Sequence, residues 1–119
     1  MSNFNFLQTN WPEFIEDAKA MEQLVYFEPR GACGRARFLI EQVVLCMYEN
    51  DEDLELPFDT GFYNIINEVS FRKVITYIIY EKINAVRKIG NIAVHEKKKI
   101  SRDYALRACE EALMFHEIS

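Results

Sequence analysis

Apolar residues recur at three- and four-residue steps along most of the chain, which is the period of an amphipathic α-helix. The first such run follows Asn10 and Pro12, which suit an N-cap and a first-turn proline, and it predicts a helix over about 11–27. Proline and glycine within 28–31 end this helix. The next run predicts a helix over about 31–49, with a face of small and large residues that favours a close neighbour: Ala32, Ala36, Leu39, Val43 and Cys46 or Met47.

The polar pattern changes in the middle of the chain. Residues 50–57 are acidic and end in a proline, so they predict a loop between two helical halves. A short helix is expected over about 60–68. This stretch is the clearest loop in the sequence, and it separates the two halves.

The second half contains the longest apolar run. Ser70 is placed to cap a helix over 71–94, and although β-branched residues are frequent there, a run of this length without alternation is not a strand. Gly90 marks a point where this helix is expected to bend or break. Ser101 then caps a last helix over 102–118.

These patterns predict an all-α protein, a single bundle of four to five helices over 1–119 with no sheet. The chain has 119 residues, of which 50% are hydrophobic and 13% aromatic, and this is enough apolar material for one packed core. Its three cysteines match neither a zinc-ligand spacing nor a disulfide framework, so a reducing cytoplasm is the expected location. No segment predicts secretion or membrane insertion, and no cofactor or metal site is expected.

Charge is unevenly distributed along the sequence. The net charge is −5, yet seven of the fourteen basic residues lie within 87–107, opposed there by two acidic residues. A local basic segment can contact phosphates even on an acidic protein, although runs of lysine are also typical of solvated turns. The candidate nucleic-acid contacts are Arg87, Lys88, Lys97, Lys98, Lys99 and Arg102.

Arg87, Asn91 and His95 follow one another at four-residue steps, so a continuous helix would align them in one polar ridge. A cation, an amide and an imidazole in this arrangement could bind a phosphodiester, with His95 as acid or base and Arg87 stabilising negative charge. The same groups could instead tie helices together by hydrogen bonds. Spacing favours the architectural interpretation, in which none of the three is catalytic.

Cys33 lies near Arg35 and Arg37, which could lower the pKa of its thiol. A single helical cysteine is more typically a small core residue, and this is the favoured interpretation.

The segment RKIGNIAVH, together with SNFNFL and a Trp-Pro pair near the N-terminus, resembles the HEPN-like domain that opens the R (restriction and translocation) subunit of type I restriction enzymes. The segment from Arg30 to Arg37, Glu41 and the Leu56-Pro57-Phe58 stretch are similar to the same family. The resemblance implies a helical accessory module, and the chain is then expected to be the N-terminal fragment of a longer subunit.

In such enzymes the nuclease and the ATP-driven DNA-translocating motor lie further along the chain. This sequence has no G-x-x-x-x-G-K-[ST] phosphate loop and no carboxylate-lysine nuclease pattern, so the domain itself is expected to be non-catalytic. The partners implied are other domains or subunits of a restriction-modification complex and DNA, with a homodimer also open.

The wider HEPN family includes metal-independent ribonucleases whose motif places an arginine four to six residues before a histidine. His95 matches the histidine and Asn91 the polar residue, but Gly90 stands where the arginine of the closest motif would be, and Arg87 is further away. The alternatives that remain are a ribonuclease using Arg87, Asn91 and His95, and a stand-alone nucleic-acid-binding or toxin-antitoxin type domain.

Overall fold

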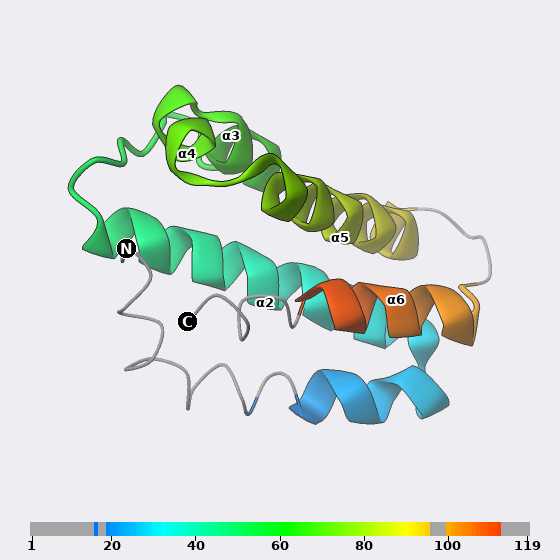
Figure 1. The fold of residues 1–119 in the computed structure, drawn as a ribbon. Helices are drawn as coiled ribbons and strands as arrows, with labels where there is room; N and C mark the ends of the chain where they lie inside the picture. The colour runs from blue at the N-terminus through cyan, green and yellow to red at the C-terminus, as the bar shows by residue number, and fades with distance from the viewer. Residues whose placement is uncertain (1–15, 17–18, 96–99, 113–119) are drawn as a thin grey trace.

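The computed structural model describes residues 16, 19–95 and 100–112, with no side-chain description at 94 and 95. Within these ranges every regular element is a helix and no strand occurs, which confirms the all-α class. A helical segment over 19–27 precedes the helices that Figure 1 labels, which are α2 (Pro29–Asn50), α3 (Phe62–Asn67), α4 (Val69–Val74), α5 (Tyr77–His95) and α6 (Arg102–Ala112).

α2 is the central helix of the core. It packs against α5 and against α6, which also pack against each other (Figure 1). α6 buries three alanines toward this contact, so the neighbouring helices can approach closely. Each large apolar side chain that is fully buried here stabilises the fold by roughly 1.5–3 kcal/mol. The buried face of α2 has the predicted helical period: Ala32, Cys33, Ala36, Leu39, Ile40, Val43, Val44 and Met47.

A single residue, Glu28, separates the segment 19–27 from α2. Pro29 lies in the first turn of α2, where its missing N–H costs no helical hydrogen bond. The Glu28 amide donates to the Leu24 carbonyl at 2.7 Å and thereby completes the preceding turn. The predicted break is confirmed, but the proline begins the second helix instead of belonging to a linker.

The prediction of one helix over 71–94 is wrong. α4 ends at Val74, Ile75 is extended with φ −100° and ψ 140°, and α5 begins at Tyr77. Thr76 caps α5, because its Oγ1 accepts a hydrogen bond from the Ile79 amide at 3.2 Å. Three β-branched residues in succession weaken the helix at this point, and the threonine cap stabilises the new start. α5 instead continues through Gly90 as one helix.

The predicted role of Ser70 as an N-cap is also wrong. Glu68 caps α4, and its carboxylate accepts hydrogen bonds from the amide and the hydroxyl of Ser70. These bonds lower the pKa of Glu68 from its usual value. The Ser70 hydroxyl in turn accepts a hydrogen bond from the Glu55 amide at 2.9 Å and so ties the preceding loop to α4.

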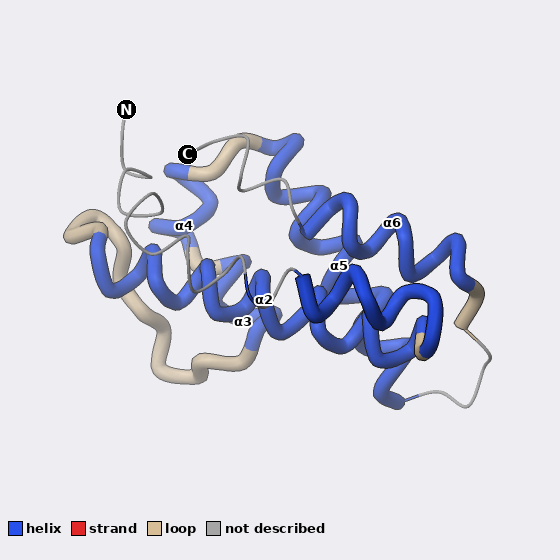
Figure 2. The backbone as a smooth tube through the Cα atoms, turned by 90° about the horizontal axis from the view of Figure 1, so that it is seen from below, coloured by secondary structure: helices blue, strands red, loops and turns tan. Residues whose placement is uncertain are grey.

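Residues 51–61, here called the acidic loop, connect α2 to α3 as predicted. Leu54 anchors the loop in the core with only 7% of its surface exposed. Asp51 and Asp59 each accept a hydrogen bond from a loop amide two residues further on, at 2.9 and 3.0 Å. Figures 1 and 2 place this loop at one end of the molecule and the turn before α6 at the other.

α6 begins as the sequence predicts. Ser101 Oγ accepts a hydrogen bond from the Tyr104 amide at 3.2 Å and caps the helix. The predicted end near 118 lies outside the described residues, as does the predicted start of the first helix near 11.

Candidate functional site

α5 and α2 approach each other closely at Gly90. A Cβ atom added there would be 2.6 Å from Cβ and 2.7 Å from Cδ of Arg37. Real Cβ atoms do not approach other heavy atoms this closely, so only glycine permits the arginine stem to lie against the backbone of α5 at this distance. Gly90 is therefore a packing residue within a continuous helix.

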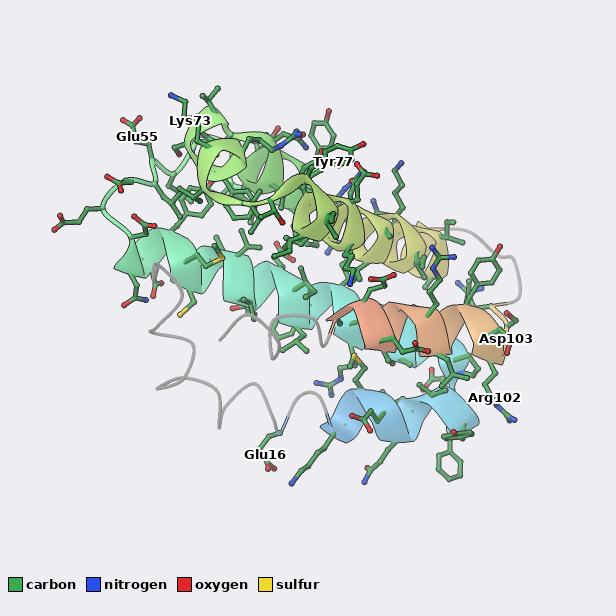
Figure 3. The ribbon with its side chains drawn as sticks, viewed as in Figure 1. Glu16, Glu55, Lys73, Tyr77, Arg102 and Asp103 are labelled. Carbon is green, nitrogen blue, oxygen red and sulfur yellow. The ribbon has the colours of Figure 1, made fainter. Side chains whose placement is uncertain are left out.

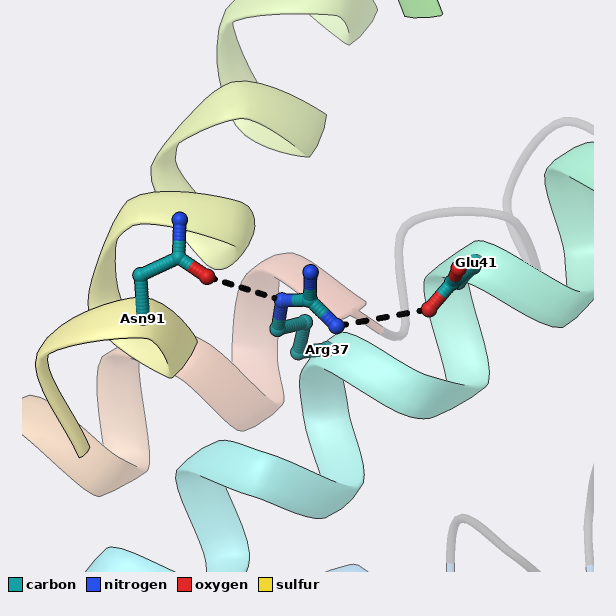
Figure 4. Close-up of polar contacts among 3 residues, drawn as sticks. All are labelled: Arg37, Glu41 and Asn91. Carbon is teal, nitrogen blue, oxygen red and sulfur yellow. Dashed lines mark hydrogen bonds and ion pairs between the residues drawn. The ribbon is translucent and has the colours of Figure 1, made fainter. Parts of the chain in front are cut away.

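Arg37 connects three helices at this crossing, and Figure 4 shows its polar contacts on two of them. Its Nε donates to Asn91 Oδ1 on α5 at 3.1 Å, and its Nη1 donates to Glu41 on its own helix at 3.3 Å. Its guanidinium also lies 5.2 Å from the ring centre of Phe62 on α3. Because Arg37 and Glu41 remain 30% and 23% exposed, this ion pair contributes less than a fully buried charged hydrogen bond.

A second arginine links the same two helices. Arg30, at the start of α2, donates through Nη1 to the backbone carbonyl of Ala93 near the end of α5. A carbonyl in the last turn of a helix has no intrahelical partner, and a guanidinium also complements the helix dipole at this end. Two arginines seven residues apart on α2 thus fix its register on α5.

Two members of the predicted ridge of Arg87, Asn91 and His95 have described contacts, and these go to different neighbours. Asn91 Oδ1 accepts the hydrogen bond from Arg37 Nε on α2, so this residue links two helices, as the architectural interpretation describes. Arg87 donates through Nε to Asn84 Oδ1 at 3.1 Å and lies over the ring of Tyr63 at 5.1 Å. The side chain of His95 lies outside the described residues, so its part of the prediction remains open.

A second polar cluster joins α3, α4 and α5. The guanidinium carbon of Arg72 is 3.6 Å from the ring centre of Tyr80, so the two groups are stacked. The Tyr80 hydroxyl donates to Asn67 Oδ1 at 2.7 Å, and Arg72 Nη1 reaches the same oxygen at 3.4 Å. This cluster is held by a tyrosine that is itself only 8% exposed.

The predicted basic segment is described only in part. Lys88 is exposed on α5, and Arg102 at the start of α6 lies over the ring of Tyr26 at 5.2 Å. Lys97, Lys98 and Lys99 lie outside the described residues. Arg87 and Lys88 thus lie on α5, whereas Arg102 lies on α6.

Cys33 is a core residue, as the favoured interpretation held. It is fully buried, and desolvation raises the pKa of its thiol despite an opposing effect of Arg30. Burial, with a smaller contribution from Cys33, raises the pKa of Cys109 to about 12. Both thiols are protonated near neutral pH, so the alternative of an activated Cys33 is wrong.

The chain matches the family model described as a domain of unknown function, DUF4145, over residues 19–116. It belongs to the DUF4145 family. The match covers every helix of the DUF4145 domain described above. No curated protein sequence and no solved structure matches the chain significantly.

The DUF4145 domain offers no metal centre in its described residues, because no group of three or more histidine, cysteine, aspartate or glutamate side chains is placed to bind an ion. Its pocket beside the acidic loop has a volume of about 360 Å³ and is lined by Asp53, Glu55, Glu68, Val69, Ser70, Lys73 and Val74. Within this lining the Ser70 hydroxyl donates to Glu68, the carboxylate that caps α4. No described helix is long and apolar enough to cross a membrane.

Sequence analysis did not identify the partners that define either cluster. Arg37 and Asn91 are 54 positions apart, and Arg72 and Tyr80 belong to helices that the sequence pattern merged. The only sequence signal for the Arg37 cluster was a Gly-Asn pair on one helix together with an arginine near the buried face of another. No local signal marked the second.

Proposed function

We propose that this DUF4145 domain is a non-catalytic docking module of a type I restriction enzyme R subunit, located in the cytoplasm. The resemblance of RKIGNIAVH and of the Arg30 to Glu41 segment supports the choice of complex. Two parts of that resemblance meet in space, since Arg37 contacts Gly90 and Asn91. These polar groups then serve the fold, and the interaction with partners falls to other surfaces.

The observation that carries the proposal is the exposed tip of the acidic loop. Phe58 is fully exposed and Leu56 is 52% exposed, although both are large apolar side chains. The loop that presents them is anchored by Leu54 in the core and by the Glu55 amide on Ser70. Because the loop is already held in place, its apolar tip loses little conformational entropy on binding. This favours Phe58 as a side chain that is buried in a partner's interface.

The charge of the loop defines the partner. Residues 51–61 contain five carboxylates and no lysine or arginine. A complementary surface is therefore an apolar pocket for Phe58 with a basic rim, on another domain or subunit of the complex. Contact with nucleic-acid backbone through the basic segment 87–107 is the second part of the proposed role.

The ribonuclease alternative has less support from the described contacts. Asn91 is occupied by Arg37, and Arg87 is directed to Asn84 and Tyr63. A general acid-base site needs its groups within reach of one substrate atom. Two of the three candidate groups are instead engaged with different neighbours.

Photo-crosslinking in the native polypeptide in its own cells tests the docking role. Phe58 is replaced by p-benzoylphenylalanine, and the crosslinked peptide is identified by mass spectrometry. We expect one dominant product, joined beside lysine or arginine on a chain that carries the G-x-x-x-x-G-K-[ST] motif of a motor domain. Phe27, which is 87% exposed on the segment 19–27, is the matched control position.

The proposal fails if position 58 gives no more product than position 27, or if its product is unrelated to restriction machinery. Phe58→Glu should remove the product while the far-ultraviolet circular dichroism remains helical.

A further inference from the structure

We propose that the outer surface of α3, α4 and α5 binds single-stranded nucleic acid through two arginine-tyrosine stacks. The site, here called the arginine-tyrosine face, consists of Tyr63, Asn67, Arg72, Tyr80 and Arg87. The site shares Arg87 with the basic segment 87–107 and deepens that part of the proposed function by adding residues of α3 and α4 and a strand form. It does not depend on docking through the acidic loop.

The two stacks form one connected structure. Asn67 accepts from Tyr80 and Arg72 through Oδ1, and its Nδ2 donates to the Tyr63 carbonyl at 2.8 Å. Tyr63 in turn lies beneath Arg87. Residues from three helices therefore hold the two guanidinium groups on one side of the bundle.

Both arginines are positioned before any ligand arrives. Arg72 is stacked at 3.6 Å on the buried Tyr80 ring, and Arg87 is fixed by its bond to Asn84. A guanidinium has five N–H donors, and each of these two uses one in the described hydrogen bonds. The remaining donors suit bidentate contact with phosphate oxygens, and a stacked arginine loses less entropy on binding.

The face is basic on an acidic protein. Residues 62–95, which span α3, α4 and α5, contain five lysine and arginine residues and two glutamates, a charge of +3 against −5 for the whole chain. Figure 3 shows Lys73 and Tyr77 on the outer side of this layer. A polyanion is attracted to such a layer by counterion release even when the rest of the protein is acidic.

Exposed aromatic rings indicate a single strand rather than a duplex. Tyr63, which lies beneath Arg87, is 58% exposed, and Tyr77 at the start of α5 is 69% exposed. Tyrosine rings stack on unpaired bases of any sequence, whereas bases in a duplex are not accessible to them. The positions of Tyr80 and Arg87 along α5 separate the stacks by about 10 Å, so a short extended strand can contact both.

Fluorescence anisotropy with the 119-residue chain tests this site. The probes are fluorescein-labelled 12-nucleotide oligo(dT) and oligo(rU), a 12-base-pair duplex, and a labelled oligoglutamate peptide of the same length. We expect both single strands to bind more tightly than the duplex or the peptide. The tighter of the two strands then identifies DNA or RNA as the ligand. Two phosphate contacts give a logarithmic salt slope of about −1.4.

Variants assign the binding to the face. Tyr63→Ala should weaken single-strand binding by about fivefold or more, while Tyr63→Phe retains the ring and the affinity. Tyr104→Ala is the matched control, because Tyr104 is 59% exposed on α6, and it should change binding by less than about twofold.

Arg72→Gln should weaken binding to a similar extent, with the exposed Arg35→Gln as its control. Equal binding to the duplex, preference for the peptide, or equal effects of the Tyr63→Ala and Tyr104→Ala changes would overturn the proposal. Crosslinking from position 58 is unaffected by any of these results, so failure here leaves the docking role intact.

Discussion

Gly90→Ala is the sharpest test of how the domain is held together. In an ordinary helix interior this change stabilises a protein by about 1 kcal/mol, because alanine has the better helix propensity. Here the new Cβ would lie 2.6 Å from Cβ, 2.7 Å from Cδ and 3.0 Å from Cγ of Arg37. The atom nearest to it is fixed to the backbone of α2, so rotation of the arginine cannot relieve the contact.

The expected magnitude follows from two opposing effects. Overpacking of a close helix contact costs about 1–3 kcal/mol. Displacement of Arg37 also weakens its bond to Asn91, which contributes about another 1 kcal/mol at a partly exposed site. After the propensity gain of about 1 kcal/mol, Gly90→Ala should lower the free energy of unfolding by about 1–3 kcal/mol.

Gly34 provides the matched control. It lies in the interior of α2, and a Cβ added there meets no heavy atom within 4 Å. Gly34→Ala should therefore raise the free energy of unfolding by about 0.5–1 kcal/mol. Urea unfolding followed by circular dichroism at 222 nm measures both variants. If Gly90→Ala is as stable as the wild type while Gly34→Ala behaves as expected, the close contact between α2 and α5 is refuted.

Three further predictions concern the polar and titratable residues. Asn91→Ala leaves Arg37 Nε without its acceptor and should lower the free energy of unfolding, measured in urea, by about 1–2 kcal/mol. Asn91→Asp keeps an acceptor, so its free energy of unfolding should stay within about 0.5 kcal/mol of the wild-type value. Above pH 9 the Cys109 thiol loses its proton in the unfolded protein, whereas in the folded protein its pKa of about 12 keeps it protonated. The free energy of unfolding should therefore fall by about 1.4 kcal/mol per pH unit. Cys109→Ala should remove that component of the slope in urea titrations between pH 9 and 10.5, and an unchanged slope would show that the thiol is not buried. The chain should not cleave a labelled single-stranded RNA without added metal, and product that disappears in His95→Ala would restore the ribonuclease alternative.

Local chemistry explains the parts of the fold that sequence predicted. The cap at Ser101 and the inward face of α2 depend on residues within one or two helical turns, so periodicity and capping rules identify them. The division between α4 and α5 was missed for the opposite reason. An apolar run without proline or glycine predicts one helix, and the competing threonine cap at Thr76 is visible only once Ile75 is extended.

The site could be predicted only in part, because its contacts connect distant segments. The four-residue spacing favoured an architectural role for Arg87, Asn91 and His95, but it could not show that Asn91 bonds to α2 or that Arg37 is the donor. Gly90 had two interpretations, a helix break or a close contact, and single-sequence propensity favours the first. The register of α2 on α5 decides between them, and register is a property of the packed core.

The break at Ile75 and Thr76 also separates two short helices, α3 and α4, from the longer α5, and the short helices are expected to be locally less stable. α3 and α4 have six residues each, which is too short for a helix to persist without tertiary support. Their support comes from the four large apolar side chains that they bury in the core, and from Tyr48, whose hydroxyl donates to the Ile65 carbonyl at 2.5 Å and whose ring stacks on Phe71. We therefore expect this pair of helices to unfold locally as one cooperative unit while α2 stays folded. Amide hydrogen exchange should then be faster in α3 and α4 than in the middle of α2. A ligand bound across α3 and α4 would therefore protect this unit from exchange more than it protects the middle of α2.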